Sequence, residues 1–118
     1  MEQKPKTFMN GNVPEIDVDE VQKFANSVLL IDVRRPEEFN NELGHVAGSK
    51  LVTLGPDLED FLNSHNNREE FLVFICRSGA RSGNATLLAR EMGFKNVYNM
   101  TGGMIRWNDF ELPVSRED

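Results

Sequence analysis

The sequence predicts an α/β domain built around a mostly parallel β-sheet. Short apolar runs alternate along the chain with stretches whose apolar residues recur at helical spacing, the pattern of βαβ units. The run 71–75 is apolar at every position, as expected of a strand that is covered on both faces. The 118 residues suit one domain, since domains most often contain about 100–150.

The first predicted elements are a helix and a buried strand. Asp17 and Glu20 have the spacing of a capping box, and apolar residues at helical spacing then predict a helix over 18–26. The apolar run that follows predicts a buried strand over 28–32.

Prolines mark the starts of the next two helices. Pro36 suits a first helical position, which predicts a short helix that stops before Gly44. After a brief strand over 50–53, Pro56 opens another helix, which ends in the polar residues 64–67.

The strongest strand signal, 71–75, ends at Cys76. A loop from Cys76 to Arg81 leads to a helix that Ser82 or a neighbour caps, and Gly93 ends that helix. The last expected elements are a strand over 96–99 and a helical turn after Gly102 and Gly103.

Composition excludes several classes of protein. Hydrophobic residues make up 39% and charged residues 27%, which excludes a disordered or fibrous chain. The longest apolar run, 71–76, is far shorter than the roughly 20 residues of a membrane helix. One cysteine cannot form an internal disulfide or a thiolate zinc site. The net charge of −6 argues against a general nucleic-acid binder.

This net charge conceals one basic segment, which begins at the cysteine. Residues 1–75 contain seven Lys/Arg and fourteen Asp/Glu, whereas residues 76–106 contain five Lys/Arg and one Glu. Positive charge near a thiol stabilises the thiolate. We therefore expect an anionic ligand to bind near Cys76.

Cys76 lies where α/β sheets hold their ligands, beyond the carboxyl end of a strand. The loop after it leads to a helix start, whose free amides can form an anion nest around the sulfur. Gly79 can adopt the positive φ that a tight nest requires, and Arg77 and Arg81 flank it. The pattern predicts a nucleophilic cysteine facing an anionic substrate; the alternative is a buried, inert thiol.

Four motifs, in order and spanning about residues 13–112, resemble the rhodanese-like sulfurtransferases. The motifs are Ile31-Asp32-Val33-Arg34 with Pro36-Glu37-Glu38-Phe39, Gly44-His45-Val46-Ala47-Gly48-Ser49, Cys76-Arg77-Ser78-Gly79-Ala80-Arg81-Ser82, and Gly102-Gly103 with Trp107. The chain departs from the family pattern at residues 40–43, where the family more often has two residues. This difference lengthens a surface loop.

The resemblance implies a central, mostly parallel five-stranded sheet with helices on both faces, and sulfur transfer. The Cys76 thiolate would take a sulfur from a small anionic donor such as thiosulfate and pass it to cyanide, a thiol or a protein. This chemistry needs no metal and no other cofactor. The implied site comprises Cys76 as nucleophile, the substrate-binding loop Arg77, Ser78, Gly79, Ala80, Arg81 and Ser82, and the supporting residues Asp32, Arg34, His45, Gly102, Gly103 and Trp107.

Some of these residues have alternative roles. Arg81 could hold the donor's anionic end, or bond loop carbonyls or a carboxylate such as Asp32. We interpret His45 as fixing a loop rather than as a base for Cys76, because persulfide chemistry requires no base. Trp107 could line either the core or the cleft.

Two other functions stay open. Related phosphatases and arsenate reductases have five residues between cysteine and arginine, so that the loop holds a tetrahedral oxyanion. Here the intervening residues 77–80 are four, which favours sulfur transfer. A persulfide carrier or regulatory interaction module could also use this fold, although Cys76 with both arginines disfavours an inactive module.

We expect three segments: a polar, frayed lead-in over 1–12, a single domain over 13–112 and an acidic tail over 113–118. The polar N-terminus carries no secretory signal, so we expect a cytoplasmic protein without membrane or nucleic-acid partners.

Overall fold

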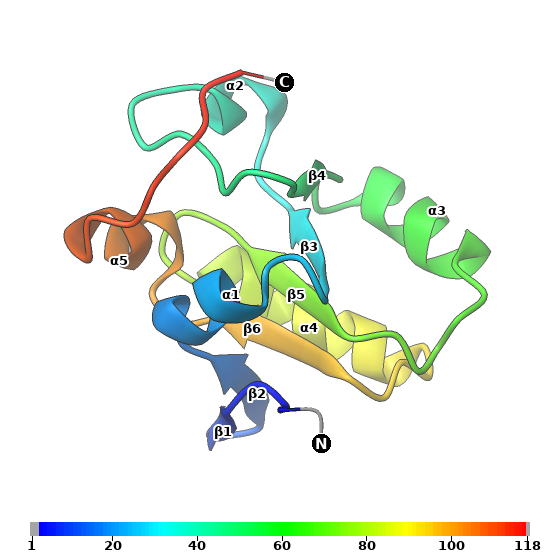
Figure 1. Ribbon diagram of the computed structural model, residues 1–118. Coiled ribbons are helices and arrows are strands. Elements are labelled where there is room, and N and C mark those ends of the chain that lie inside the picture. The colour runs from blue at the N-terminus through cyan, green and yellow to red at the C-terminus, as the bar shows by residue number, and fades with distance from the viewer. Residues whose placement is uncertain (1–2, 118) are drawn as a thin grey trace.

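A computed structural model describes residues 3–117, and the structural statements below concern these residues. The elements in chain order are β1 (Thr7–Asn10), β2 (Val13–Ile16), α1 (Val18–Phe24), β3 (Leu29–Asp32), α2 (Pro36–Phe39), β4 (Lys50–Leu51), α3 (Pro56–Ser64), β5 (Leu72–Ile75), α4 (Ala80–Glu91), β6 (Val97–Met100) and α5 (Gly103–Asp109). Figure 1 shows their arrangement around one central sheet.

The sheet has six strands in the order β1-β2-β6-β5-β3-β4. β1 and β2 form an antiparallel hairpin, and the other neighbouring pairs are parallel. The prediction of a mostly parallel α/β sheet is therefore confirmed, but with six strands instead of the expected five. Because β5 and β6 are parallel neighbours, their carboxyl ends lie at the same edge of the sheet, where α4 and α5 begin.

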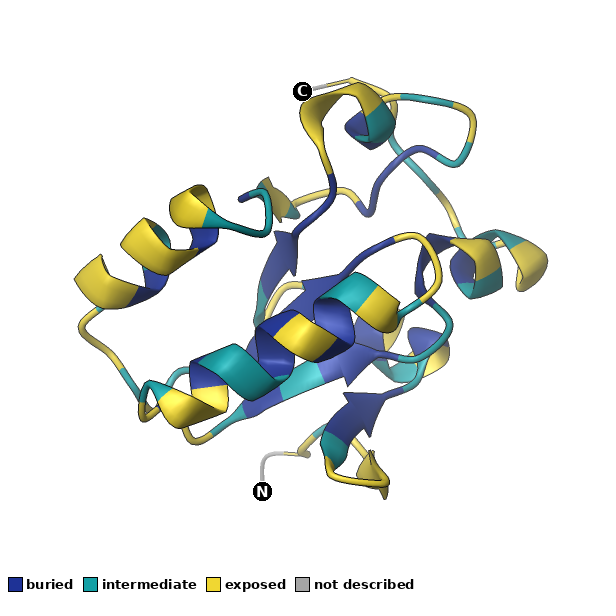
Figure 2. Cartoon of the chain, turned by 180° about the vertical axis from the view of Figure 1, so that it is seen from behind, coloured by how far each residue is buried: buried dark blue, intermediate teal, exposed yellow. Residues whose placement is uncertain are grey.

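Helices cover both faces of the sheet. The helices α3 and α4 pack on one face, and α1 and α5 pack on the other. β5 lies between these layers: Leu72 and Phe74 join the first cluster of apolar side chains, and Val73 and Ile75 join the second. Figure 2 shows the central strands buried and the outward faces of the helices exposed. This burial explains why β5 is apolar without alternation.

Two helix starts differ in detail from the prediction. The Asp17 carboxylate caps α1 by accepting a hydrogen bond from the Val18 amide at 2.7 Å. Glu20 does not complete the predicted capping box, since its carboxylate accepts instead from the Lys6 amide at 2.7 Å. The helix α4 begins earlier than expected: Gly79 is its N-cap, so Ser82 lies inside the first turn.

The N-terminal segment differs most from the prediction. Part of the expected lead-in, Thr7–Asn10, is the edge strand β1, and β2 joins the hairpin to β6. All four residues of β1 are exposed, so its sequence has no apolar alternation to reveal it. The signal that could have found the hairpin is the Gly11-Asn12 pair, a two-residue turn in which Gly11 has a φ of 63°. The domain boundaries at 13 and 112 stay a prediction.

Within residues 3–117, no helix is both long and apolar enough to cross a bilayer.

The buried position of Ile16 predicts that the hairpin is an integral part of the fold. Ile16 on β2 is completely buried, whereas Met9 on β1 is 57% exposed. We expect Ile16→Ala to lower the free energy of unfolding by about 2–5 kcal/mol, because it leaves a cavity in the core. The matched control Met9→Ala is expected to change it by about 0.5 kcal/mol or less. Urea unfolding followed by circular dichroism measures both, and equally small losses would contradict an integral hairpin.

Candidate active site

The loop after β5 places the cysteine at the carboxyl edge of the sheet. Cys76 follows Ile75 directly, and only three residues separate it from the first residue of α4. The residue is 1% exposed and packs with the apolar cluster under α3 and α4. The predicted strand, cysteine and helix are therefore found in that order, with the thiol pointing inward.

Three hydrogen-bond donors converge on the sulfur. The Gly79 amide lies 3.1 Å from Cys76 Sγ, the Ser82 amide 3.4 Å and the Ser82 hydroxyl 3.1 Å. Gly79 reaches this geometry with a φ of 103°, which a residue with a Cβ rarely adopts. Donors at the start of α4 that point at one sulfur stabilise a thiolate there.

The outer side of the loop rests on the start of α5. The amides of Met104 and Ile105 donate to the carbonyls of Cys76 and Arg77 at 2.9 and 3.0 Å. A Cβ atom on Gly103 would lie 2.5 Å from both carbonyl oxygens. Gly103 thus permits a close approach of two backbones, and it also makes a turn, with a φ of 60°.

Arg81 pairs with a carboxylate, but not with Asp32. Its two terminal nitrogens donate to Glu38 Oε1 and Oε2 at 2.7 and 2.9 Å, which ties α4 to α2. These hydrogen bonds lower the pKa of Glu38 from 4.5 to about 2 and raise the pKa of Arg81. In this structure the Arg81 guanidinium is therefore already paired with a carboxylate of α2.

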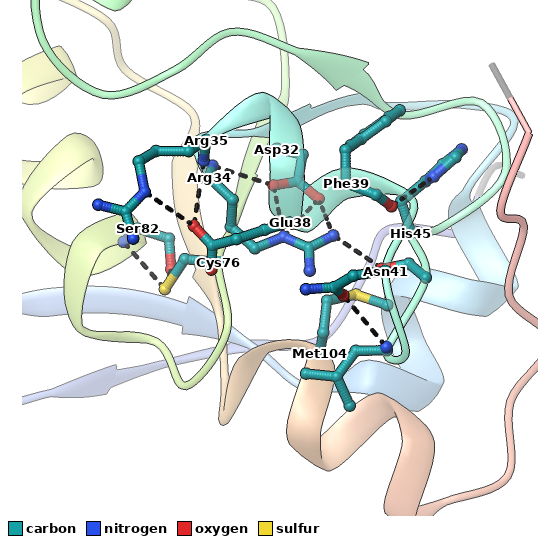
Figure 3. Close-up of polar contacts among 12 residues, drawn as sticks. Asp32, Arg34, Arg35, Glu38, Phe39, Asn41, His45, Cys76, Ser82 and Met104 are labelled. Carbon is teal, nitrogen blue, oxygen red and sulfur yellow. Dashed lines mark hydrogen bonds and ion pairs between the residues drawn. The ribbon is translucent and has the colours of Figure 1, made fainter.

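The carboxylate of Asp32 is held by Arg34 in a buried pair, as Figure 3 shows. Arg34 Nε donates to Asp32 Oδ1 at 2.9 Å and Nη2 donates to Oδ2 at 2.8 Å. Nη2 also donates to the Gly44 carbonyl at 2.8 Å. The pair thus ties the end of β3 to the turn before His45.

His45 and Trp107 both hold segments of the chain together. The buried His45 ring stacks on Phe39 with centroids 3.7 Å apart, and its Nδ1 lies 3.0 Å from the Phe39 carbonyl oxygen. Its backbone pairs with Ser115, so part of the expected tail contacts the domain. Trp107 lies in the core cluster beside α1, and its Nε1 donates to the Pro113 carbonyl at 3.0 Å.

The other loop residues lie at the rim. Arg77, Ser78 and Ala80 are exposed. The Arg77 side chain is 49% exposed and lies 4.0 Å from a Glu42 oxygen, in the lengthened surface loop. Arg77 is thus the loop arginine that solvent reaches most easily.

Three polar residues of the site were not predicted. Glu38 pairs with Arg81, and Asn99 and Glu15 form a buried hydrogen-bonded pair beneath the loop. Glu38 lies in a recognised motif, but its partner is 43 positions away. Asn99 stands out only as a polar residue in an apolar strand. Among residues 3–117, no group of three or more His, Cys, Asp or Glu side chains is placed to hold a metal ion.

The ion pair of Glu38 predicts a pH-dependent contribution to stability. A carboxylate whose pKa is about 2 in the folded state and near 4.5 when unfolded stabilises the fold above pH 4.5, and this contribution is lost as the pH falls towards 2. We expect Glu38→Gln to cost about 1 kcal/mol at pH 7, since water partly screens the pair. The stability difference from the wild type should shrink below pH 4.5.

Urea unfolding of both proteins between pH 2 and 8 measures this difference. The control is Glu37→Gln, because Glu37 is 71% exposed on the same helix. A Glu38→Gln deficit that is independent of pH would contradict the ion-pair explanation.

Comparison with known proteins identifies relatives. The family model described as "Rhodanese-like domain" matches residues 17–110. A sulfurtransferase of Allochromatium vinosum is 33% identical, over 86% of this chain and 94% of the relative. The human single-domain sulfurtransferase TSTD1 is 26% identical with a TM-score of 0.72, over 83% of this chain and 97% of that one. A Rhodopseudomonas palustris protein of unknown function, RPA3614, described as a possible tyrosine phosphatase, is 26% identical with a TM-score of 0.77, over 96% and 100%.

The family match covers the sheet from α1 onward and the whole Cys76 loop. Relatives named sulfurtransferases support a sulfur-transfer function in general. By its sequence motifs, its fold and this match, the chain belongs to the rhodanese-like domain family.

Proposed function

We propose that this protein is a sulfurtransferase that carries a sulfane sulfur on Cys76, from an anionic donor such as thiosulfate to a thiol, cyanide or protein acceptor. The observation that carries the proposal is the convergence of three donors on Cys76 Sγ. Because Cys76 is only 1% exposed, its donor must present a narrow terminal sulfur. We place the reaction in the cytoplasm, where reducing conditions keep a single thiol free.

The proposed chemistry has two steps. The Cys76 thiolate attacks the terminal sulfur of thiosulfate, the sulfur–sulfur bond of the donor breaks, and sulfite leaves with the bonding electron pair. The acceptor then attacks the outer sulfur of the resulting persulfide, whose sulfur–sulfur bond breaks to regenerate the thiolate. Neither step needs an external oxidant or reductant. The Gly79 and Ser82 amides around Sγ stabilise the negative sulfur at the start and end of the cycle.

The carboxylates around Arg77 and Arg81 support different roles for these two side chains. Arg81 is engaged at both terminal nitrogens by Glu38, so much of its charge is already compensated. Arg77 directly follows Cys76 in the chain and is exposed, and the carboxylate oxygen that it pairs with, on Glu42, lies 4.0 Å away. We propose that Arg77 binds the anionic end of the donor and that Arg81 positions the loop.

The phosphatase alternative has less support. Only four residues separate Cys76 from Arg81, one fewer than related enzymes use to enclose a tetrahedral oxyanion. The guanidinium of Arg81 is also bound to Glu38. Both features favour a sulfur donor over a phosphate ester.

The proposal predicts a persulfide that depends on one residue. Incubation with thiosulfate should add the mass of one sulfur atom to the wild type and none to Cys76→Ser, as measured by intact-mass spectrometry. Cyanide should then release thiocyanate and restore the original mass. Hydrolysis of an aryl phosphate without any sulfur adduct would overturn the proposal. An adduct with negligible turnover would identify a carrier instead.

The role of Arg77 predicts an effect on one half-reaction. Arg77→Ala should raise the thiosulfate KM for persulfide formation roughly tenfold, because one charged hydrogen-bond donor is lost. Sulfur transfer from the preformed persulfide to a neutral thiol should keep its rate. Arg90→Ala removes the same charge from an exposed site on α4 and is the control. Stopped-flow measurement of each half-reaction tests this, and equal losses in both would indicate a loop-shaping role for Arg77.

A further inference from the structure

A buried chain of hydrogen bonds leads from the sulfur into the sheet. The Ser82 hydroxyl lies 3.1 Å from Cys76 Sγ and forms a short hydrogen bond with Asn99 Oδ1. Asn99 Nδ2 in turn donates to Glu15 Oε2 at 2.8 Å. Ser82 is completely buried, Asn99 is 3% exposed and Glu15 is 5% exposed. The chain runs through α4, β6 and β2, and its members Asn99 and Glu15 take no part in the reaction as proposed above.

The orientation of the Asn99 amide is determined by its neighbours. Nδ2 donates to Glu15 Oε2 and, at 3.1 Å, to the Gly79 carbonyl. The second oxygen of Glu15 accepts from the Thr101 hydroxyl at 3.1 Å, which holds the carboxylate in place. A flipped amide would set its oxygen against two acceptors. The Asn99 oxygen must therefore face Ser82.

The Ser82 hydroxyl consequently has one hydrogen and two acceptors. It can donate to Asn99 Oδ1 or to Cys76 Sγ, but not to both at full strength. With a neutral thiol, Cys76 donates to Ser82, Ser82 donates to Asn99, and every group is satisfied. With a thiolate, Ser82 must turn towards the sulfur, which leaves the buried Asn99 oxygen without its donor. Such an unpaired buried acceptor is unfavourable.

We propose that Glu15 and Asn99 are positioning residues that direct the Ser82 hydroxyl towards Asn99 Oδ1. They thereby make the Cys76 thiolate less favourable than the forms in which Sγ carries no charge. A persulfide is one such form, because its negative charge lies on the outer sulfur and Ser82 can return to Asn99. This last consequence rests on the proposed function; the effect on the thiolate does not. The pair would thus favour the sulfur-loaded protein over the free thiolate.

Charged groups lie in the loop and on the elements that surround it. They are Arg77 in the loop, Arg81 on α4, Asp32 on β3, Glu38 on α2, Arg106 on α5 and Glu15 on β2. Substitution of Asn99 removes none of these six charged side chains, but it removes a hydrogen bond to Glu15, so the hydroxyl direction is isolated by repeating the substitution without the Ser82 hydroxyl. Glu15→Gln removes a charge but leaves the hydroxyl direction as it is, so it serves as a contrast.

The test is the pH dependence of Cys76 alkylation by iodoacetamide, which reports the thiolate at the one cysteine of the chain. We expect Asn99→Ala to lower the midpoint pH by about one unit, since Ser82 is then free to donate to the sulfur. In a Ser82→Ala background, Asn99→Ala should produce no shift. A double-mutant cycle of the wild type, Asn99→Ala, Ser82→Ala and the double variant therefore measures the part of the shift that depends on the Ser82 hydroxyl.

Glu15→Gln provides the contrast. Its side-chain oxygen can still accept from Asn99, so the amide keeps its orientation while a negative charge is lost. Its effect on the midpoint should persist in the Ser82→Ala background, as expected of charge alone. Asn99→Val, which suits a strand and has no side-chain hydrogen-bond acceptor, replaces Asn99→Ala if that variant does not fold.

No midpoint shift in Asn99→Ala, or the same shift with and without the Ser82 hydroxyl, would overturn the inference. Intact-mass measurement after thiosulfate treatment separates this outcome from failure of the proposed function. If thiosulfate loads no sulfur on the wild type, the sulfurtransferase proposal fails, whereas the alkylation cycle still decides the role of Asn99.

Discussion

The rest of the site depends on one constraint: the short loop after β5 must find hydrogen-bond partners for its backbone amides on one side and for its backbone carbonyls on the other. Its amides turn inward to Cys76 Sγ, and its carbonyls turn outward to the amides of Met104 and Ile105. This is possible because β5 and β6 are parallel neighbours, so that α4 and α5 start at the same edge of the sheet. The loop is held between two helix starts, and Gly103 allows the second of them to approach. The reactive geometry is therefore a consequence of sheet topology.

Charge acts on this loop through pairs rather than through net charge. The basic segment 76–106 suggests a strongly positive site, yet Arg81 is compensated by Glu38 and Arg106 by Asp17. Both carboxylates have a lowered pKa, so they remain ionised well into the acid range. Of the two loop arginines, Arg77 is thus the less compensated, since the Glu42 oxygen that it pairs with lies 4.0 Å away. Counting charges along the chain overstates the local field because the opposite charges come from other elements.

Local signals account for what could be predicted from the sequence. An apolar run, one cysteine and a glycine-containing turn lie within a few positions of one another, so strand, thiol and helix start could be read together. The partners of the polar residues could not, because pairing depends on how distant strands and helices are brought together. Arg81 and Glu38 are 43 positions apart, and Asn99 and Glu15 are 84 apart. The exposed strand β1 gave no periodic signal, and the hairpin was missed with it.

The missed hairpin and the missed polar chain have the same origin. Pairing of β2 with β6 sets Glu15 directly beside Asn99, so the N-terminal hairpin supplies the carboxylate that orients the amide beneath the active-site loop. Stability alone gives no reason for this arrangement. Two apolar side chains at these positions would fill the space without the free-energy cost of removing a carboxylate from water. The arrangement is explained if the hairpin acts on Cys76. It extends the sheet by two strands, and its Glu15 orients Asn99, whose side-chain oxygen competes with Cys76 for the Ser82 proton.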